Sequence, residues 1–72
     1  MELLIFKTDI RTKKKIKIVE PIFNNIPSIH DWSVDIEDID NVLRIEGDHN
    51  IKEGDVIELI KTCGFNCEIL PD

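Results

Sequence analysis

The chain has 72 residues, of which 42% are hydrophobic and 33% are charged, and its formal net charge is −6. No apolar run approaches the ~18 residues that a transmembrane helix requires. The acidic balance argues against general nucleic-acid binding, for which a basic domain is expected. We therefore expect one soluble globular domain over residues 1–72, with no membrane and no nucleic acid among its partners. Two cysteines without a recognisable signal peptide favour a reducing, cytoplasmic location.

The charge is unevenly distributed along the chain. Residues 1–17 contain six basic side chains and two acidic ones, whereas residues 18–72 contain three basic and thirteen acidic ones. A molecule with separated charges of this kind can steer a charged partner towards one end.

The first half of the chain contains one clear element and one ambiguous segment. Apolar, β-prone residues 2–8 predict a first strand. In residues 12–26, Ile16 and Ile18 alternate with lysines as they would in a strand, and Pro21 would cost about 3 kcal/mol in a helix interior. A helix is supported by four apolar residues at helical spacing, Ile16, Val19, Phe23 and Ile26. The residues alone leave strand and helix equally supported.

Two runs of alternating polarity then predict a β-hairpin. In residues 31–37, the apolar side chains of Trp32, Val34 and Ile36 lie on one face, and polar or acidic side chains lie on the other. Residues 42–47 alternate again, and the short polar turn between the two runs is typical of a hairpin.

The last third of the chain predicts a helix followed by a strand. In residues 51–63, apolar side chains recur at spacings of three and four. Asn50 with Glu53 resembles a capping box, and Gly64 lies where a left-handed residue commonly ends a helix. Residues 66–70 predict a short final strand.

Three segments occur in the order and at the spacing of a known motif. Residues 9–15 are Asp-Ile-Arg-Thr-Lys-Lys-Lys, residues 19–23 are Val-Glu-Pro-Ile-Phe, and residues 26–29 are Ile-Pro-Ser-Ile. Heavy-metal-associated domains carry Gly-Met-x-Cys-x-x-Cys, Val-Glu-x-Ala-Leu and Val-Pro-Gly-Val at these positions, and this chain resembles them over its whole length. Residues 32–35 and 60–65 resemble the second strand and the helix-to-strand loop of the family.

The resemblance implies that residues 13–26 are mostly helical, and Pro21 then implies a kink or a loose first turn before it. The resemblance implies an α+β, ferredoxin-like βαββαβ fold, in which a four-stranded antiparallel sheet carries two helices on one face. It also implies that Ile10 is buried, because this residue occupies the position of the buried methionine of the family.

The chain departs from the family at the metal-binding loop, where Thr12 and Lys15 occupy the positions of the two cysteines. Family members bind Cu(I) and other soft ions through two thiolates, because soft ions prefer sulfur. A threonine hydroxyl is a weak ligand, and a protonated lysine has no lone pair. We therefore expect a degenerate family member that holds no metal or other cofactor and acts as a small non-enzymatic binding domain.

The replaced loop forms a run of cations, and the resemblance places Lys61 in the neighbouring loop. The candidate binding site for an acidic protein or another anion comprises Arg11, Lys13, Lys14, Lys15 and Lys61. Cations at a helix start oppose the helix dipole, but together with free N–H groups they attract an anion. Opposite charges elsewhere on the molecule would then give weak head-to-tail self-association. The alternative is a solvated loop with no selected role.

The two cysteines support an alternative function. Cys63 and Cys67 lie on apolar faces of their predicted elements, and we expect them to be buried. Two thiols do not complete a structural zinc site. The alternative is a retained role in heavy-metal, copper-like transport or homeostasis, either through these two thiols or beside an intact partner.

Other features of the sequence are less specific. His30 and His49 are isolated in predicted loops, and we expect them at the surface. No nucleophile with a nearby base and no phosphate-binding loop indicates an enzyme. A third possible function is a scaffold that assembles through exposed edge strands, and the sequence leaves the oligomeric state open.

Overall fold

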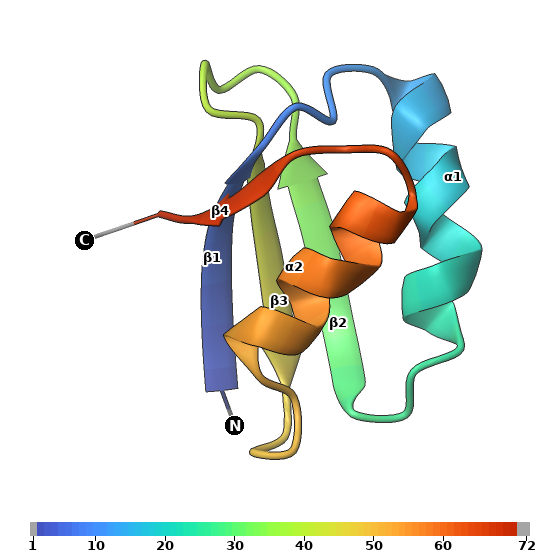
Figure 1. The fold of residues 1–72 in the computed structure, drawn as a ribbon, viewed down its shortest axis with the longest axis vertical. Helices are drawn as coiled ribbons and strands as arrows, with labels where there is room; N and C mark the ends of the chain where they lie inside the picture. The colour runs from blue at the N-terminus through green and yellow to red at the C-terminus, as the bar shows by residue number, and fades with distance from the viewer. Residues whose placement is uncertain (1, 71–72) are drawn as a thin grey trace.

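The computed structural model describes residues 2–70 and contains four strands and two helices in the order βαββαβ (Figure 1). The elements are β1 (Glu2–Thr8), α1 (Lys13–Asn24), β2 (Ile29–Asp35), β3 (Val42–Gly47), α2 (Glu53–Thr62) and β4 (Cys67–Ile69). The strands form one antiparallel sheet in the order β2-β3-β1-β4. The predicted ferredoxin-like fold is confirmed. Neither helix in this part of the chain is long and apolar enough to cross a membrane.

The core lies between one face of the sheet and both helices. The sheet contributes Phe6, Leu43 and Ile45, and the helices contribute Val19, Phe23, Val56 and Ile60, all of them almost completely buried. The next residues along β1 and β3, including Lys7 and Arg44, are exposed on the opposite face. This alternation explains why the strands were recognisable from the sequence.

The ambiguous segment after β1 is a helix. Val19 and Phe23 lie one turn apart on α1 and are buried in the core, so the helical stripe prevails over the local alternation. The helix continues through the exposed Pro21 and ends at Asn24, two residues before the predicted end. Ile26 precedes Pro27, and a residue before proline disfavours the helical conformation, which accounts for the early end.

The predicted bounds of the second strand were wrong by two residues, because β2 runs from Ile29 to Asp35. The Asp35 carboxylate accepts a hydrogen bond from the Glu37 N–H at 3.1 Å, which turns the chain before residue 37. The Asp38 carboxylate accepts a second bond from the Asp40 N–H at 2.8 Å. Such local side-chain bonds compete with strand pairing, so residues 36–37 lie in the turn.

The predicted capping box of the second helix is wrong. Lys52 is the N-cap of α2, and its side chain makes no capping hydrogen bond. The Asn50 N–H instead donates to the Asp48 carboxylate at 2.8 Å within the preceding turn. Ile51 and Val56, which flank the helix start, both belong to the core and fix the entry of the chain by apolar packing.

The second helix ends at Thr62, one residue before its predicted bound, and the predicted left-handed glycine after it is confirmed. Gly64 has a φ of 91°, and its N–H donates to the Lys61 carbonyl at 2.9 Å. The Phe65 N–H donates to the Ile60 carbonyl at 3.2 Å. These two bonds form a Schellman motif, which satisfies carbonyls that the end of a helix leaves free. The final strand β4 is shorter than predicted, with three residues, Cys67–Ile69.

Candidate functional site

The connection between β1 and α1 is held in place by a buried threonine at its start. The Thr8 hydroxyl donates to the Asn41 carbonyl at 2.7 Å and accepts a hydrogen bond from the Ile10 N–H at 3.2 Å. Ile10 itself is fully buried, as the resemblance implied. The loop that follows therefore starts from a fixed position beside the β2–β3 turn.

Thr12 ends this loop as the N-cap of α1. Its hydroxyl accepts a hydrogen bond from the Lys15 N–H at 3.1 Å, and its carbonyl accepts from the Ile16 N–H at 3.1 Å. A threonine at this position typically stabilises a helix by about 1 kcal/mol. This role was not predicted from the sequence, although a threonine directly before a helix is a recognisable start signal.

Four cations surround the start of α1. Arg11, Lys13 and Lys14 are exposed, while Lys15 is half-buried and places its Nζ 6.0 Å from the centre of the Phe65 ring. The first turn of α1 contains no acidic residue. Within residues 2–70 the one ion pair joins Lys7 to Asp40 at 3.7 Å, so none of the four cations is paired with a carboxylate in this part of the chain.

Lys61, the fifth predicted member of the site, lies in the last turn of α2 and not in the loop after it. There its positive charge interacts favourably with the C-terminal end of the helix dipole. Phe65 connects the two regions. The Lys15 Nζ lies over its ring, and its N–H donates a hydrogen bond to the Ile60 carbonyl in α2. The structure thus groups Arg11 with the three consecutive lysines and places Lys61 on the neighbouring element.

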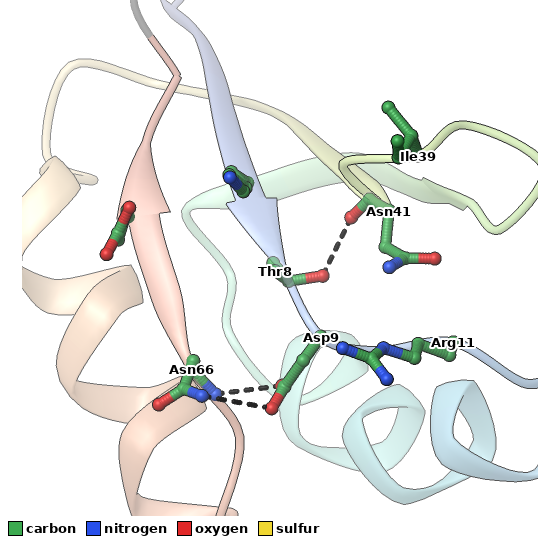
Figure 2. Close-up of a pocket in the computed structure, with 8 residues that line it drawn as sticks. Thr8, Asp9, Arg11, Ile39, Asn41 and Asn66 are labelled. Atoms are coloured by element: carbon green, nitrogen blue, oxygen red, sulfur yellow. Dashed lines mark hydrogen bonds between the residues drawn. The ribbon is translucent and has the colours of Figure 1, made fainter.

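A hollow of about 270 Å³ lies beside Arg11, where the ends of β1, the β2–β3 turn and the start of β4 meet (Figure 2). The Asp9 carboxylate lines this hollow and accepts hydrogen bonds from the Asn66 N–H at 2.9 Å and from the Asn66 Nδ2 at 3.2 Å. The full lining comprises Lys7, Thr8, Asp9, Arg11, Ile39, Asn41, Asn66 and Glu68. The Asp9–Asn66 clamp joins residues 57 positions apart, and no local pattern in the sequence predicts it.

The two cysteines are free thiols that differ in accessibility. Cys67 is 3% exposed, whereas Cys63 is half-buried. Burial raises the pKa of the Cys67 thiol from its ordinary value of 9.0 to about 11, the nearby Lys61 charge opposes the rise, and Glu68 adds to it. Because the thiolate is the nucleophile and the metal ligand, this environment makes Cys67 a poor one near neutral pH.

Other metal-binding residue types are dispersed in the structure. His30 and His49 are exposed. Across residues 2–70, no three histidine, cysteine, aspartate or glutamate side chains are grouped so that they could hold a metal ion.

Comparisons with known proteins give matches at the level of structure. No family model matches the chain, and no curated protein matches it by sequence. The solution structure of the yeast copper transporter domain Ccc2a, in apo and Cu(I)-loaded states, is similar with a TM-score of 0.83, 18% identity, and coverage of 100% of this chain and 99% of that one. A chain in the solution structure of the Atx1–Cu(I)–Ccc2a complex is similar with a TM-score of 0.85, 18% identity and the same coverage.

A crystal structure of a copper binding domain from HMA7, a P-type ATPase, is similar with a TM-score of 0.83 and 26% identity, and the match covers 99% of this chain and 96% of that one. These likenesses extend over nearly the full length of each chain. The chain therefore has the heavy-metal-associated fold of these copper-transporter domains.

Proposed function

We propose that residues 1–72 form a single non-enzymatic, cytoplasmic binding domain that uses the basic start of α1 to bind an acidic protein segment. The observation that carries this proposal is the group of four cations, Arg11, Lys13, Lys14 and Lys15, which have no carboxylate partner within residues 2–70. In this proposal Thr12 and Lys15 replace the two thiolates with a helix cap and a positive charge. The positive charge of Lys15 would thus occupy the position at which the family binds a metal cation.

The neighbouring structures support a protein as the partner. The Atx1–Cu(I)–Ccc2a complex is an assembly of two proteins, one of which has the fold found here. In a complex of that kind, a loop that no longer holds a metal would still be an exposed docking surface. The cations on this chain would then select a partner of opposite charge.

The affinity depends on several charges acting together. An exposed ion pair contributes only about 0–1 kcal/mol, so one lysine does not hold a partner. The first turn of α1 adds free N–H groups and the positive end of the helix dipole. We expect weak binding that fades as ionic strength approaches about 0.15 M, where the screening length is about 8 Å.

The direct test is a titration of the ¹⁵N-labelled chain with a peptide rich in glutamate and aspartate, followed by NMR at low salt. We expect chemical-shift changes confined to residues 9–17 and 61–65. The Lys13→Ala/Lys14→Ala variant, which loses two exposed charges at the site, should weaken these changes. The matched control is Arg44→Ala/Lys52→Ala, which loses two exposed charges elsewhere and should retain them.

Two outcomes of this titration would contradict the proposal. One is an absence of shift changes in residues 9–17 at low salt. The other is an equal loss of binding in both double variants, which would show that net charge and not the loop attracts the peptide.

A second candidate function is a retained role in heavy-metal handling. It is favoured by the likeness to Cu(I)-loaded and copper-binding domains over nearly the full length of the chain. The thiol ligands would then be Cys63 and Cys67, or the metal would be held by an intact partner. The burial and the raised pKa of Cys67 argue against the first of these routes.

A further inference from the structure

The end of the molecule that carries the basic loop, defined as Arg11 and the first three residues of α1 (Lys13, Lys14 and Lys15), also exposes a large apolar side chain. Ile39 lies in the β2–β3 turn and is 93% exposed. The turn is fixed on both sides, because the Asn41 N–H donates to the Asp38 carbonyl at 3.0 Å and the Thr8 N–H donates to the Asp40 carbonyl at 3.1 Å. Ile39 is therefore held outward on a fixed backbone, as Figure 2 shows. A single exposed apolar residue is common, so the residues around Ile39 determine whether its exposure indicates a binding surface.

The surroundings of Ile39 carry opposite charges. Its own turn contains the exposed acidic residues Glu37 and Asp38, and the exposed Asp35 ends the preceding strand β2. Arg11, from the basic loop, lines the same hollow of about 270 Å³ as Ile39. An acidic turn and a basic loop thus lie side by side at one end of the molecule, with an apolar side chain and a hollow between them.

This arrangement is self-complementary under a two-fold rotation. When two copies meet end to end about an axis through this surface, the acidic turn of each copy faces the basic loop of the other. The contact is then made twice and closes on itself. The head-to-tail association expected from the sequence is a different arrangement, in which the basic loop would meet carboxylates at the opposite end of the sheet, such as Glu2 and Glu46. Such a contact does not close between two copies as a two-fold contact does.

We propose that two copies of this chain form a two-fold dimer through this end, with Ile39 of each copy in the hollow of the other, beside Arg11. The dimer rests on the proposed function in that it uses the same basic loop, and it names a second copy as the acidic partner. Burial of two isoleucine side chains supplies the apolar contribution that charges at an exposed surface lack. The net charge of −6 per copy opposes association, so we expect a weak dimer.

The other route to self-association, pairing of edge strands, is disfavoured at β2. The Trp32 N–H, which a partner strand would need, donates to the Asp31 carboxylate at 2.9 Å. The pairing of β2 with β3 is also irregular between Ile29 and Asp31. Bulges and acidic side chains of this kind protect an edge strand from pairing with another copy.

The test begins with analytical ultracentrifugation of the native chain over a wide range of concentrations. We expect the average mass to rise above the 8.3 kDa of one copy as concentration increases. Ile39→Ser should weaken association about tenfold or more, because it removes the apolar contact. Leu3→Ser is the matched control, since Leu3 is 56% exposed on the open face of the sheet, and association should be unchanged.

Charge exchange then tests the pairing itself. Glu37→Lys and Lys13→Glu/Lys14→Glu should each weaken self-association, and their equimolar mixture should restore it. Glu37 is chosen because the carboxylates of Asp35 and Asp38 bond the turn backbone. A native chain that stays monomeric, an unchanged Ile39→Ser variant, or a mixture no stronger than its components would overturn the dimer. A monomer that still binds the acidic peptide would refute the dimer and leave the proposed function intact.

Discussion

The connections β1–α1 and α2–β4 lie side by side, joined by the Asp9–Asn66 clamp, but they present opposite chemistry. The first contains Arg11 and leads into the three lysines at the start of α1, and three of these four cations are exposed. The second contains the half-buried Cys63 and leads into Cys67, the first residue of β4, which has only 3% of its surface exposed. At this end of the molecule the cationic side chains are exposed, whereas the thiols are partly or fully buried. A partner would therefore meet positive charge there and little accessible sulfur.

The starts of the two helices extend this comparison. The first turn of α2 carries Glu53 and Asp55, and its last turn carries Lys61, as the helix dipole favours. The first turn of α1 carries only cations and relies on the Thr12 cap. The α1 start thus gives up stability that a different sequence would have, and such exceptions are expected where a surface has a role in binding.

The largest expected effect concerns the buried thiol of Cys67. Its pKa is raised from 9.0 to about 11 in the folded chain, so the unfolded chain loses this proton at a lower pH. This contribution to stability is fully present below pH 9 and is lost as pH rises through 11, and it amounts to about 2–3 kcal/mol. Urea unfolding from pH 8 to pH 11.5 measures it.

Two cysteine variants control this experiment. Cys67→Ala should lower stability at neutral pH, because it removes core volume, but its alkaline slope should be shallower than that of the native chain. Cys63→Ala should retain the native slope. If Cys67→Ala also retains the native slope, burial does not raise the pKa of the Cys67 thiol, and the contrast between exposed cations and a buried thiol is contradicted.

The next effect concerns the backbone that positions the thiols. Gly64→Ala should destabilise the chain by about 1–2 kcal/mol, because a φ of 91° is unfavourable for a residue with a side chain. Gly54→Ala is the matched control. It lies inside α2 with open space around its Cα, and alanine there should stabilise by about 0.4–1 kcal/mol. Thermal unfolding of both variants should show shifts of opposite sign.

A similar but smaller effect is expected at the start of α1. Thr12→Ala should cost about 1 kcal/mol, because the Lys15 N–H loses its acceptor. Thr12→Ser keeps the oxygen and should retain most of the stability. Equal losses in the two variants, measured by urea unfolding, would mean that the hydroxyl does not cap the helix.

The smallest effect tests the unfavourable charges directly. Lys14→Glu should stabilise the chain by about 0.3–1 kcal/mol, since it places a negative charge near the start of α1. Asp55→Lys makes the reverse change in the first turn of α2 and should destabilise by a similar amount. Both shifts should shrink at high salt, where exposed charges are screened. Shifts of the same sign in the two variants would contradict the dipole argument.

Sequence patterns predicted the elements well, because alternation and helical spacing report burial directly. The alternation at Trp32 and Val34 located β2, although the turn carboxylates of Asp35 and Asp38 ended it before residue 36. The family resemblance, and not the local pattern, identified α1 as a helix. The sequence supported the apolar helical stripe and the strand-like alternation of this segment equally. In the structure Val19 and Phe23 of the stripe are buried in the core.

The candidate site was predictable only in part. The cationic run is contiguous in sequence, so Arg11 and the three lysines were evident. The Asp9–Asn66 clamp, the exposure of Ile39 and its closeness to Arg11 depend on how distant segments meet. No local pattern reports such contacts, because they arise only when β1, the β2–β3 turn and β4 are assembled in one sheet.

A Cu(I) competition assay tests most directly whether this end of the domain presents positive charge in place of thiolate. The native chain, with both cysteines reduced, is added to a coloured Cu(I) complex of a moderate-affinity chelator. We expect no transfer of Cu(I) to the native chain and clear transfer to Thr12→Cys/Lys15→Cys, which restores two soft ligands at the helix start. Transfer to the native chain that is lost in Cys63→Ser or Cys67→Ser would contradict the claim.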